Sequence, residues 1–323
     1  MRTNCLLAGF TLTALFSAGS AFAADPRLMN LLMPDARVVA GVNVTNARIT
    51  PFGQYVLSQM TSSVDQQLTG FINTTGFDPR QDVSEIIAAS SVNLTSPGGL
   101  LVALGNFRVD QLSAAIAKMP HVTLQNYGGA TVITGGDAKN SFSIAFFGTN
   151  IAALGDAASV KAAVDRSAGA NSINPALATR VQALSTTEDA WAVTLDPITS
   201  FIPGMSAGSD IPGMFAGIQA SSGGVKFGAS VDITAQAITT DPKNAKALAD
   251  VVQALATIFS MSGGQDPQFA SLAKLLQGVR VSADGTAMNL TLSIPEAQLE
   301  TIMNGMVAQA KPMLRPGKTA AVN

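Results

Sequence analysis

Residues 35–44 read Asp-Ala-Arg-Val-Val-Ala-Gly-Val-Asn-Val, and from Arg37 onward the run is apolar and rich in β-branched side chains. A run of this kind predicts a buried β-strand. Residues 189–193 read Asp-Ala-Trp-Ala-Val and repeat the opening of that stretch. The pattern therefore predicts a strand near the start of the fold and a second strand of the same kind in the other half of the chain.

Helix and turn signals around these strands also follow one another in the same order in each half. Thr50-Pro51 opens a helix after the first strand. Asp110 caps a short helix later in the first half, and Asp241-Pro242 caps a helix at the corresponding place in the second half. Ala89-Ser90-Ser91 and Ala220-Ser221-Ser222 each lie in a hairpin strand followed by a glycine-rich turn. We predict an α+β fold of two diverged copies of a strand-helix-hairpin-helix-hairpin-helix unit, with mostly antiparallel sheets covered by helices. Because few letters match, a chance repetition of this order is the alternative.

The first residues have the pattern of a cleavable signal peptide. Arg2 is followed by an uncharged apolar run from Cys5 to Phe16 and by Ala21-Phe22-Ala23, the small-x-small pattern that signal peptidase requires. We expect cleavage to leave Ala24 as the first residue. The apolar run is too short to span the roughly 30 Å hydrocarbon core of a bilayer.

These signals divide the chain into five parts. We predict a signal peptide at 1–23, a first α+β lobe at 24–168, a connecting segment at 169–185, a second lobe at 186–311 and a disordered tail at 312–323. The destination is the periplasm or the extracellular space.

Composition excludes several classes of partner and site. Cys5 lies ahead of the apolar run, so the mature chain has neither a thiol nor a lipid-modified cysteine. The 19 basic residues of the whole chain include Arg2, which leaves 18 against 21 acidic residues after cleavage. The basic residues are scattered singly, so we expect no nucleic-acid partner, and no second apolar run predicts a transmembrane span.

Motifs for catalysis or metal binding are weak. His121 is the only histidine of a chain whose single cysteine lies in the leader, and zinc sites need several such ligands. Gly204-Met205-Ser206-Ala207-Gly208 matches the G-x-S-x-G elbow of hydrolases, but no histidine follows it, and the triad order requires one. Ser271 and Lys274 match S-x-x-K, a match expected by chance in a serine-rich chain. We predict no catalytic residue, no metal and no cofactor.

The segment Pro197–Gly217 is the candidate contact region. It contains the heptapeptide Ile-Pro-Gly-Met-x-Ala-Gly twice, at residues 202–208 and 211–217. Its prolines and glycines prevent one long helix, and its large side chains are apolar and adaptable. Four of them are candidate contacts for a ligand or partner: Phe201, Met205, Met214 and Phe215. One interpretation is a mobile apolar lid or docking loop, and the other is a broken helix that covers the second lobe.

Three stretches resemble a family of exported bacterial proteins of unknown function. The family pairs a Pro-Asp-Ala-x-Val-Val opening with a Thr-Gly-Phe-Asp-Pro-x-x-Asp turn, and this chain has these patterns at residues 34–39 and 75–82, with Pro-Phe-Gly-Gln at residues 51–54 between them. The resemblance covers roughly the first 110 residues clearly. It implies an exported α+β protein and supplies no activity, ligand or site residues.

Three hypotheses follow. The first is an exported non-catalytic binding or scaffold protein whose partner is an unknown protein or an apolar small molecule. The second is a carrier of an apolar ligand held between the lobes under residues 197–217. The third is an enzyme that uses Asp, Ser or Lys in an unrecognised site. A deep apolar cavity would favour the carrier, converging carboxylates the enzyme, and a flat surface the binding protein.

Overall fold

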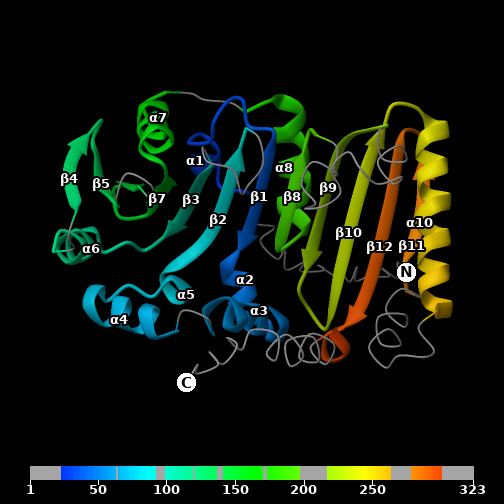
Figure 1. The fold of residues 1–323 in the computed structure, drawn as a ribbon, viewed down its shortest axis with the longest axis horizontal. Coiled ribbons are helices and arrows are strands. Elements are labelled where there is room, and N and C mark those ends of the chain that lie inside the picture. The colour runs from blue at the N-terminus through cyan, green and yellow to red at the C-terminus, as the bar shows by residue number, and fades with distance from the viewer. Residues whose placement is uncertain are drawn as a thin grey trace, which may run out of the picture.

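The computed structural model describes residues 23–62, 65–91, 99–118, 121–136, 141–169, 173–196, 217–262 and 278–299. The fold is α+β (Figure 1). The elements of the first half are α1 Pro26–Met29, β1 Val38–Asn43, α2 Val44–Ile49, α3 Pro51–Ser62, α4 Asp65–Thr75, α5 Pro79–Asp82, β2 Val83–Ser90, β3 Leu100–Gly105, α6 Val109–Ile116, β4 Val122–Tyr127, β5 Ala130–Gly135, β6 Phe142–Phe147, β7 Ile151–Gly155 and α7 Ala157–Ser167. Those of the second half are α8 Pro175–Thr187, β8 Ala190–Thr194, β9 Ile218–Lys226, β10 Ser230–Thr239, α10 Pro242–Ser262, β11 Arg280–Asp284 and β12 Ala287–Pro295.

Several element boundaries follow from local signals in the sequence. Asp156 caps α7, and the side chain of Asp241 accepts a hydrogen bond from the amide of Asn244 in the first turn of α10. The predicted first strand ends earlier than expected. Asn43 caps α2 by accepting from the amide of Asn46, so the chain turns helical at Val44.

All the described strands belong to one antiparallel sheet of 12 strands, in the order β11-β12-β10-β9-β8-β1-β2-β3-β7-β6-β5-β4. This single sheet corrects the expectation of a separate sheet in each half. The two matched strands of the sequence, β1 and β8, pair with each other at the centre, with Ala40 opposite Ala192. Figure 1 shows the sheet across the whole width of the molecule, from β4 at one end to β11 and β12 at the other.

One face of the central strands is covered by α1, α7 and α8, and we call it the covered face. Alternate residues of the strands point to this face, because side chains alternate along a strand. The core here contains residues with at most 2% exposure from strands and helices alike: Leu28, Val39, Ile87, Val102, Val160, Leu177 and Val181. Burial of each such side chain contributes about 1.5–3 kcal/mol, so this layer holds the N-terminal segment and both halves together.

The opposite face is covered only towards its two ends by described helices. Helices α4 and α6 pack on β5 and β6 at one end, through Phe71, Leu112, Ile133 and Phe146. At the other end α10 packs on β10, β11 and β12 through Leu248 and Met288. The expectation of sheets covered by helices is therefore not confirmed over the middle of this face, where no described helix lies. We call this part the open face. Within the described part of the chain, no helix is long and apolar enough to cross a membrane.

Candidate functional site

The residues proposed from sequence as contacts do not have a described position. Phe201, Met205, Met214 and Phe215 lie outside the described residues, as do Ser206 of the G-x-S-x-G match and both residues of the S-x-x-K match. His121 is described, and it lies exposed in a turn before β4. No described group of three or more His, Cys, Asp or Glu side chains could hold a metal ion.

The open face carries a row of small residues across the five central strands. Ala40 on β1 lies opposite Ala88 on one side and Ala192 on the other. Ala192 lies opposite Gly223, and Gly223 lies opposite Ala235. Residues directly opposite each other in an antiparallel sheet point to the same face. We call these five residues the small-residue row.

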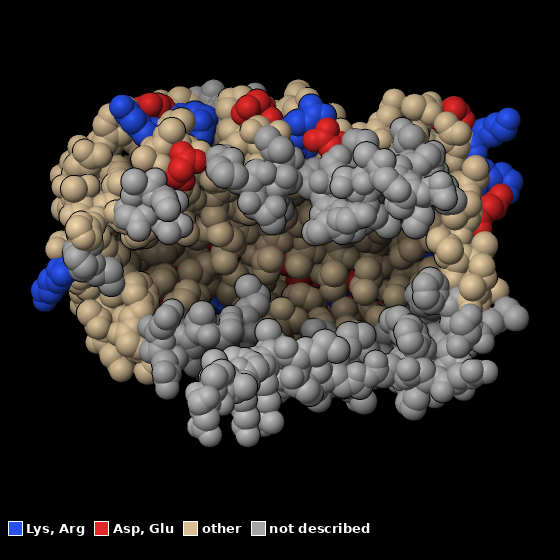
Figure 2. Space-filling model, viewed as in Figure 1, with Lys and Arg blue, Asp and Glu red and all other residues tan. Residues whose placement is uncertain are grey.

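Larger apolar side chains continue the row at both ends. Leu101 and Leu154 follow Ala88 on β3 and β7, and Leu290 follows Ala235 on β12. Ala192 is exposed although it lies on a central strand, and Leu154 keeps 38% of its surface exposed. Figure 2 shows this face hollowed along its middle, with uncharged side chains over most of the floor. Small residues in the centre and larger ones at the ends give the floor its concave shape.

A single unpaired hydroxyl lies beside this row. Ser221 lies on β9 two residues before Gly223, so its side chain points to the same face. It is 6% exposed, and its Oγ has no hydrogen-bond partner among the described residues. A buried hydroxyl without a partner costs free energy, so a hydrogen-bond partner for Ser221 Oγ would stabilise the folded protein.

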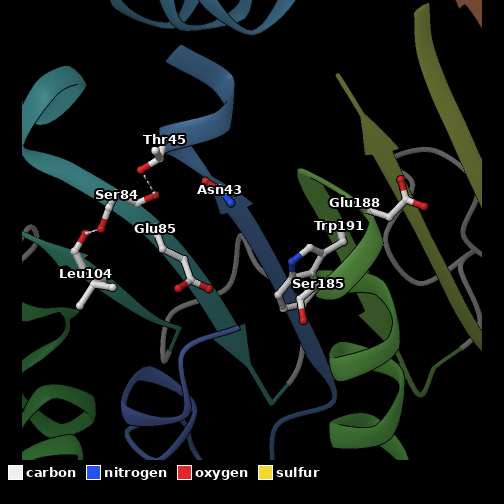
Figure 3. A pocket seen from close by; sticks show the side chains of 8 residues that line it. All are labelled: Asn43, Thr45, Ser84, Glu85, Leu104, Ser185, Glu188 and Trp191. Atoms are coloured by element: carbon white, nitrogen blue, oxygen red, sulfur yellow. Dashed lines mark hydrogen bonds between the residues drawn. The ribbon is translucent and has the colours of Figure 1, made fainter. Parts of the chain in front are cut away.

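A polar pocket lies on the covered face of the same strands (Figure 3). Its volume is about 130 Å³, and it is lined by Asn43, Thr45, Ser84, Glu85, Leu104, Ser185, Glu188 and Trp191. Trp191 is 6% exposed and packs over Gly41, where an added Cβ would lie 2.3 Å from the indole ring. The absence of a side chain at Gly41 therefore allows the indole to lie against the sheet and form one wall.

The two carboxylates of the pocket are both perturbed by burial. Burial raises the pKa of Glu85 from 4.5 to about 7, and the Asp25 amide partly opposes this by hydrogen bonding to the carboxylate. Burial also raises the pKa of Glu188, whose Oε2 has no hydrogen-bond partner among the described residues. Figure 3 shows the two carboxylates apart, with Trp191 and Ser185 between them. They do not form the close pair that general acid and base catalysis on one substrate atom would use.

The N-terminal segment reaches two residues of this pocket. The Ala24 amide donates to Ser185 Oγ at 3.0 Å, and the Asp25 amide donates to Glu85 Oε2 at 3.3 Å. Ala24 is buried at 9% exposure, while Ala23 before it is exposed. The side chain of Asp25 caps α1 by accepting from the Arg27 amide. The start of the described chain therefore lies inside the fold, where it contacts β2 through Glu85 and α8 through Ser185.

Comparison with known proteins identifies the fold. No family model matches the chain, and no curated protein matches it. A solved structure of a protein named TP0453, in crystal form III, is similar. Its TM-score is 0.53 at 9% identity, and the match covers 88% of this chain and 99% of that one. Crystal forms I and IV of TP0453 give TM-scores of 0.49 at 7% identity, covering 88% and 85% of this chain and 98% and 96% of theirs. The likeness to form III shows a shared fold.

Sequence reasoning missed the residues of the polar pocket, although one signal was present. Glu85 lies in an apolar strand, two residues before Ile87 and four before Ala89, both of which are buried. A carboxylate at the same alternation as two core residues points inward and indicates a buried polar site. Nothing in the local sequence of α8 indicated that Ser185 and Glu188 would lie beside it.

Proposed function

We propose that this chain is an exported, non-catalytic binding protein that holds one elongated apolar molecule, such as a hydrocarbon chain, on the open face of its sheet. The observation that carries the proposal is the small-residue row, an apolar floor at the centre of the sheet that no described helix covers. Monomeric soluble proteins rarely leave a continuous apolar surface of this kind without a use for it.

The chemistry of the open face favours a hydrocarbon over a peptide. The residues of β1, β8 and β10 on this face are apolar or hydroxyl-bearing, and none is charged. The backbone groups of these central strands pair with neighbouring strands on both sides, so the face offers side chains alone. A peptide laid on it would keep its own amides without partners, which costs free energy. A hydrocarbon chain has no such groups.

Export is the second part of the proposal and is supported by the residues around the predicted cleavage site. Ala23 is exposed and Ala24 is buried, so the predicted cleavage site lies at a step from an exposed to a buried residue. We propose a periplasmic or extracellular location. The mass of protein recovered from the periplasm or medium tests this, because export and cleavage require a chain that starts at Ala24.

We also propose that the two halves are diverged copies. Outward from the centre, the first half runs β1, β2, β3, β7 and β6, and the second runs β8, β9, β10, β12 and β11. In both halves a hairpin follows the central strand, and the last strand of the half returns beside the third. The first half has a further hairpin, β4–β5, at its outer end. Superposition of residues 36–168 on 186–311 tests this, with β2 required to fall on β9.

Binding of palmitate to the purified protein tests the ligand proposal. We expect saturable binding that Ala192→Phe weakens at least tenfold, because the new ring fills the hollow at its centre. Thr291→Phe is the matched control. Thr291 is exposed on β12 between Leu290 and Leu292, so its side chain points to the opposite face, and binding should not change. Equal binding by all three proteins, or no binding together with a copurifying protein from the periplasm, would favour a scaffold instead.

A further inference from the structure

The polar pocket contains a feature that the binding proposal does not use. It holds a half-buried carboxylate, Glu85, without a described cation beside it. The backbone nitrogen that reaches Ser185 belongs to the residue that follows the predicted cleavage site. We propose that signal-peptide cleavage supplies a cation to this pocket. The new α-ammonium group of Ala24 binds between Ser185 and Glu85 and stabilises the mature fold. The inference rests on the export part of the proposed function.

The chemistry of cleavage supplies the missing charge. Hydrolysis breaks the C–N bond between Ala23 and Ala24. The oxygen of the water adds to the Ala23 carbonyl carbon, which becomes a carboxylate, and both protons of the water end on the Ala24 nitrogen. At neutral pH the nitrogen becomes an ammonium with three N–H donors, where the uncleaved peptide has one N–H and no charge. One donor keeps the bond to Ser185 Oγ, which is 3.0 Å away.

The position of the adjacent amide shows that the carboxylate is within reach. The Asp25 nitrogen, one residue along, lies 3.3 Å from Glu85 Oε2. Ala24 and Ser185 are at most 9% exposed and Glu85 is half-buried, so an ion pair here would be screened less by water and salt than a pair on the surface. A buried carboxylate with no cation is costly, and a hydrogen-bonded ion pair relieves that cost.

The other charged groups near the pocket have contacts of their own. The carboxylate of Asp25 lies close enough to Glu85 to raise its pKa, but it pairs with Arg27 at 2.7 Å. On the α8 side Glu188 interacts with Asp189 and with Lys226, and it accepts a hydrogen bond from Thr234. Within the described part of the chain, neither Arg27 nor Lys226 forms an ion pair with Glu85. The ammonium of Ala24 therefore fits this position.

The contacts of the Ala24 ammonium would join distant parts of the chain. Ser185 is 161 residues from Ala24 and lies on α8, while Glu85 is 60 residues from Asp25 and lies on β2. The ammonium would therefore bridge the start of the chain, the first half and the second half. A chain that still carries residues before Ala24 has the peptide nitrogen in this place and lacks the charge.

Thermal unfolding of two chains at pH 7 tests the inference. One chain begins at Ala24 with a free amine, and the other carries one extra glycine ahead of Ala24. We expect the chain that begins at Ala24 to have a Tm higher by about 2–4 °C. In the Glu85→Gln background the difference should disappear, because no carboxylate remains to pair with the ammonium. Asp250→Asn is the control, since Asp250 lies in an exposed pair with Lys246 and should leave the difference intact.

A second measurement keeps the test valid if Glu85→Gln fails to fold. Nitrogen-15 NMR of the unmodified α-amine reports its pKa, which we expect above the roughly 8 of a free α-amino group in the chain that begins at Ala24. Three results would each overturn the proposed ammonium contact: equal Tm values in the unsubstituted pair, a difference that persists in Glu85→Gln, or an unshifted amine pKa.

Palmitate binding measured on the same chains separates this inference from the ligand proposal, because palmitate binding reports on the opposite face of the sheet. The mass of exported protein tests cleavage itself.

Discussion

The two faces of the central strands differ in a way that is unusual for a half-covered sheet. The covered face of β1 and β8 holds Gly41 under the ring of Trp191 and continues into a pocket with the half-buried side chains of Glu85 and Glu188. The open face holds Ala40 and Ala192, which are apolar and not covered by any described helix. A sheet with one solvated face normally has polar residues on it. The open face departs from this pattern at its centre, and the proposed apolar ligand would explain the departure.

The largest expected effect comes from truncating the covered face. Trp191→Ala should lower the free energy of unfolding by about 3–5 kcal/mol, because it removes a buried ring and leaves a cavity beside the pocket. Chemical denaturation measures this. A loss below about 1 kcal/mol would show that the covered face at β8 is not part of the core.

A smaller loss is expected from crowding the same contact. Gly41→Ala places a Cβ 2.3 Å from the Trp191 ring, so the ring must move, at a cost of about 1–3 kcal/mol. The control is Gly70→Ala on α4, where no atom lies within 4 Å of the new Cβ and helix propensity favours alanine by about 0.5–1 kcal/mol. Similar urea midpoints for the two variants would contradict the close packing of Trp191 on β1.

The pH dependence of stability sharpens the comparison on the side of the pocket. In a chain that keeps residues before Ala24, the pKa of Glu85 is about 7 in the folded state against 4.5 without burial. The folded state therefore holds more protons than the unfolded state between these values. This contribution to stability is fully present below about pH 4.5 and is lost as the pH rises to about 7.

Urea midpoints between pH 4.5 and 8 measure this contribution as the difference from Glu85→Gln, which should lack that part of the decline. In a chain that begins at Ala24 the decline should be smaller, because the ammonium favours the charged carboxylate. The same slope in the unsubstituted protein and in Glu85→Gln would contradict a raised pKa for Glu85.

The smallest effect is expected on the open face. Ala192→Ser should change the free energy of unfolding by no more than about 0.5 kcal/mol, because the side chain is exposed. It should weaken palmitate binding, since it adds a hydroxyl to the apolar floor. Unchanged binding would remove the centre of the small-residue row from the proposed site.

The sequence predicted most of the local structure and little of the site. The apolar runs around Val39 and Val193 marked β1 and β8, and Asp241-Pro242 marked the start of α10. The predicted contact residues, Phe201 to Phe215, lie outside the described residues, so that hypothesis stays a prediction. The polar pocket was missed because each of its residues is unremarkable among its own neighbours in the chain.

What the sequence determined by itself is the alternation of side chains along each strand, the helix starts and the cleavage pattern at Ala21-Phe22-Ala23. These follow from backbone geometry and from side chains a few residues apart. Only the tertiary structure decided that β1 pairs with β8, that Ala40, Ala192 and Gly223 share one row, and that Ala24 meets Ser185. Strand partners and registers depend on contacts between residues far apart in the chain, and the free energy of those contacts is set by how the whole sheet packs.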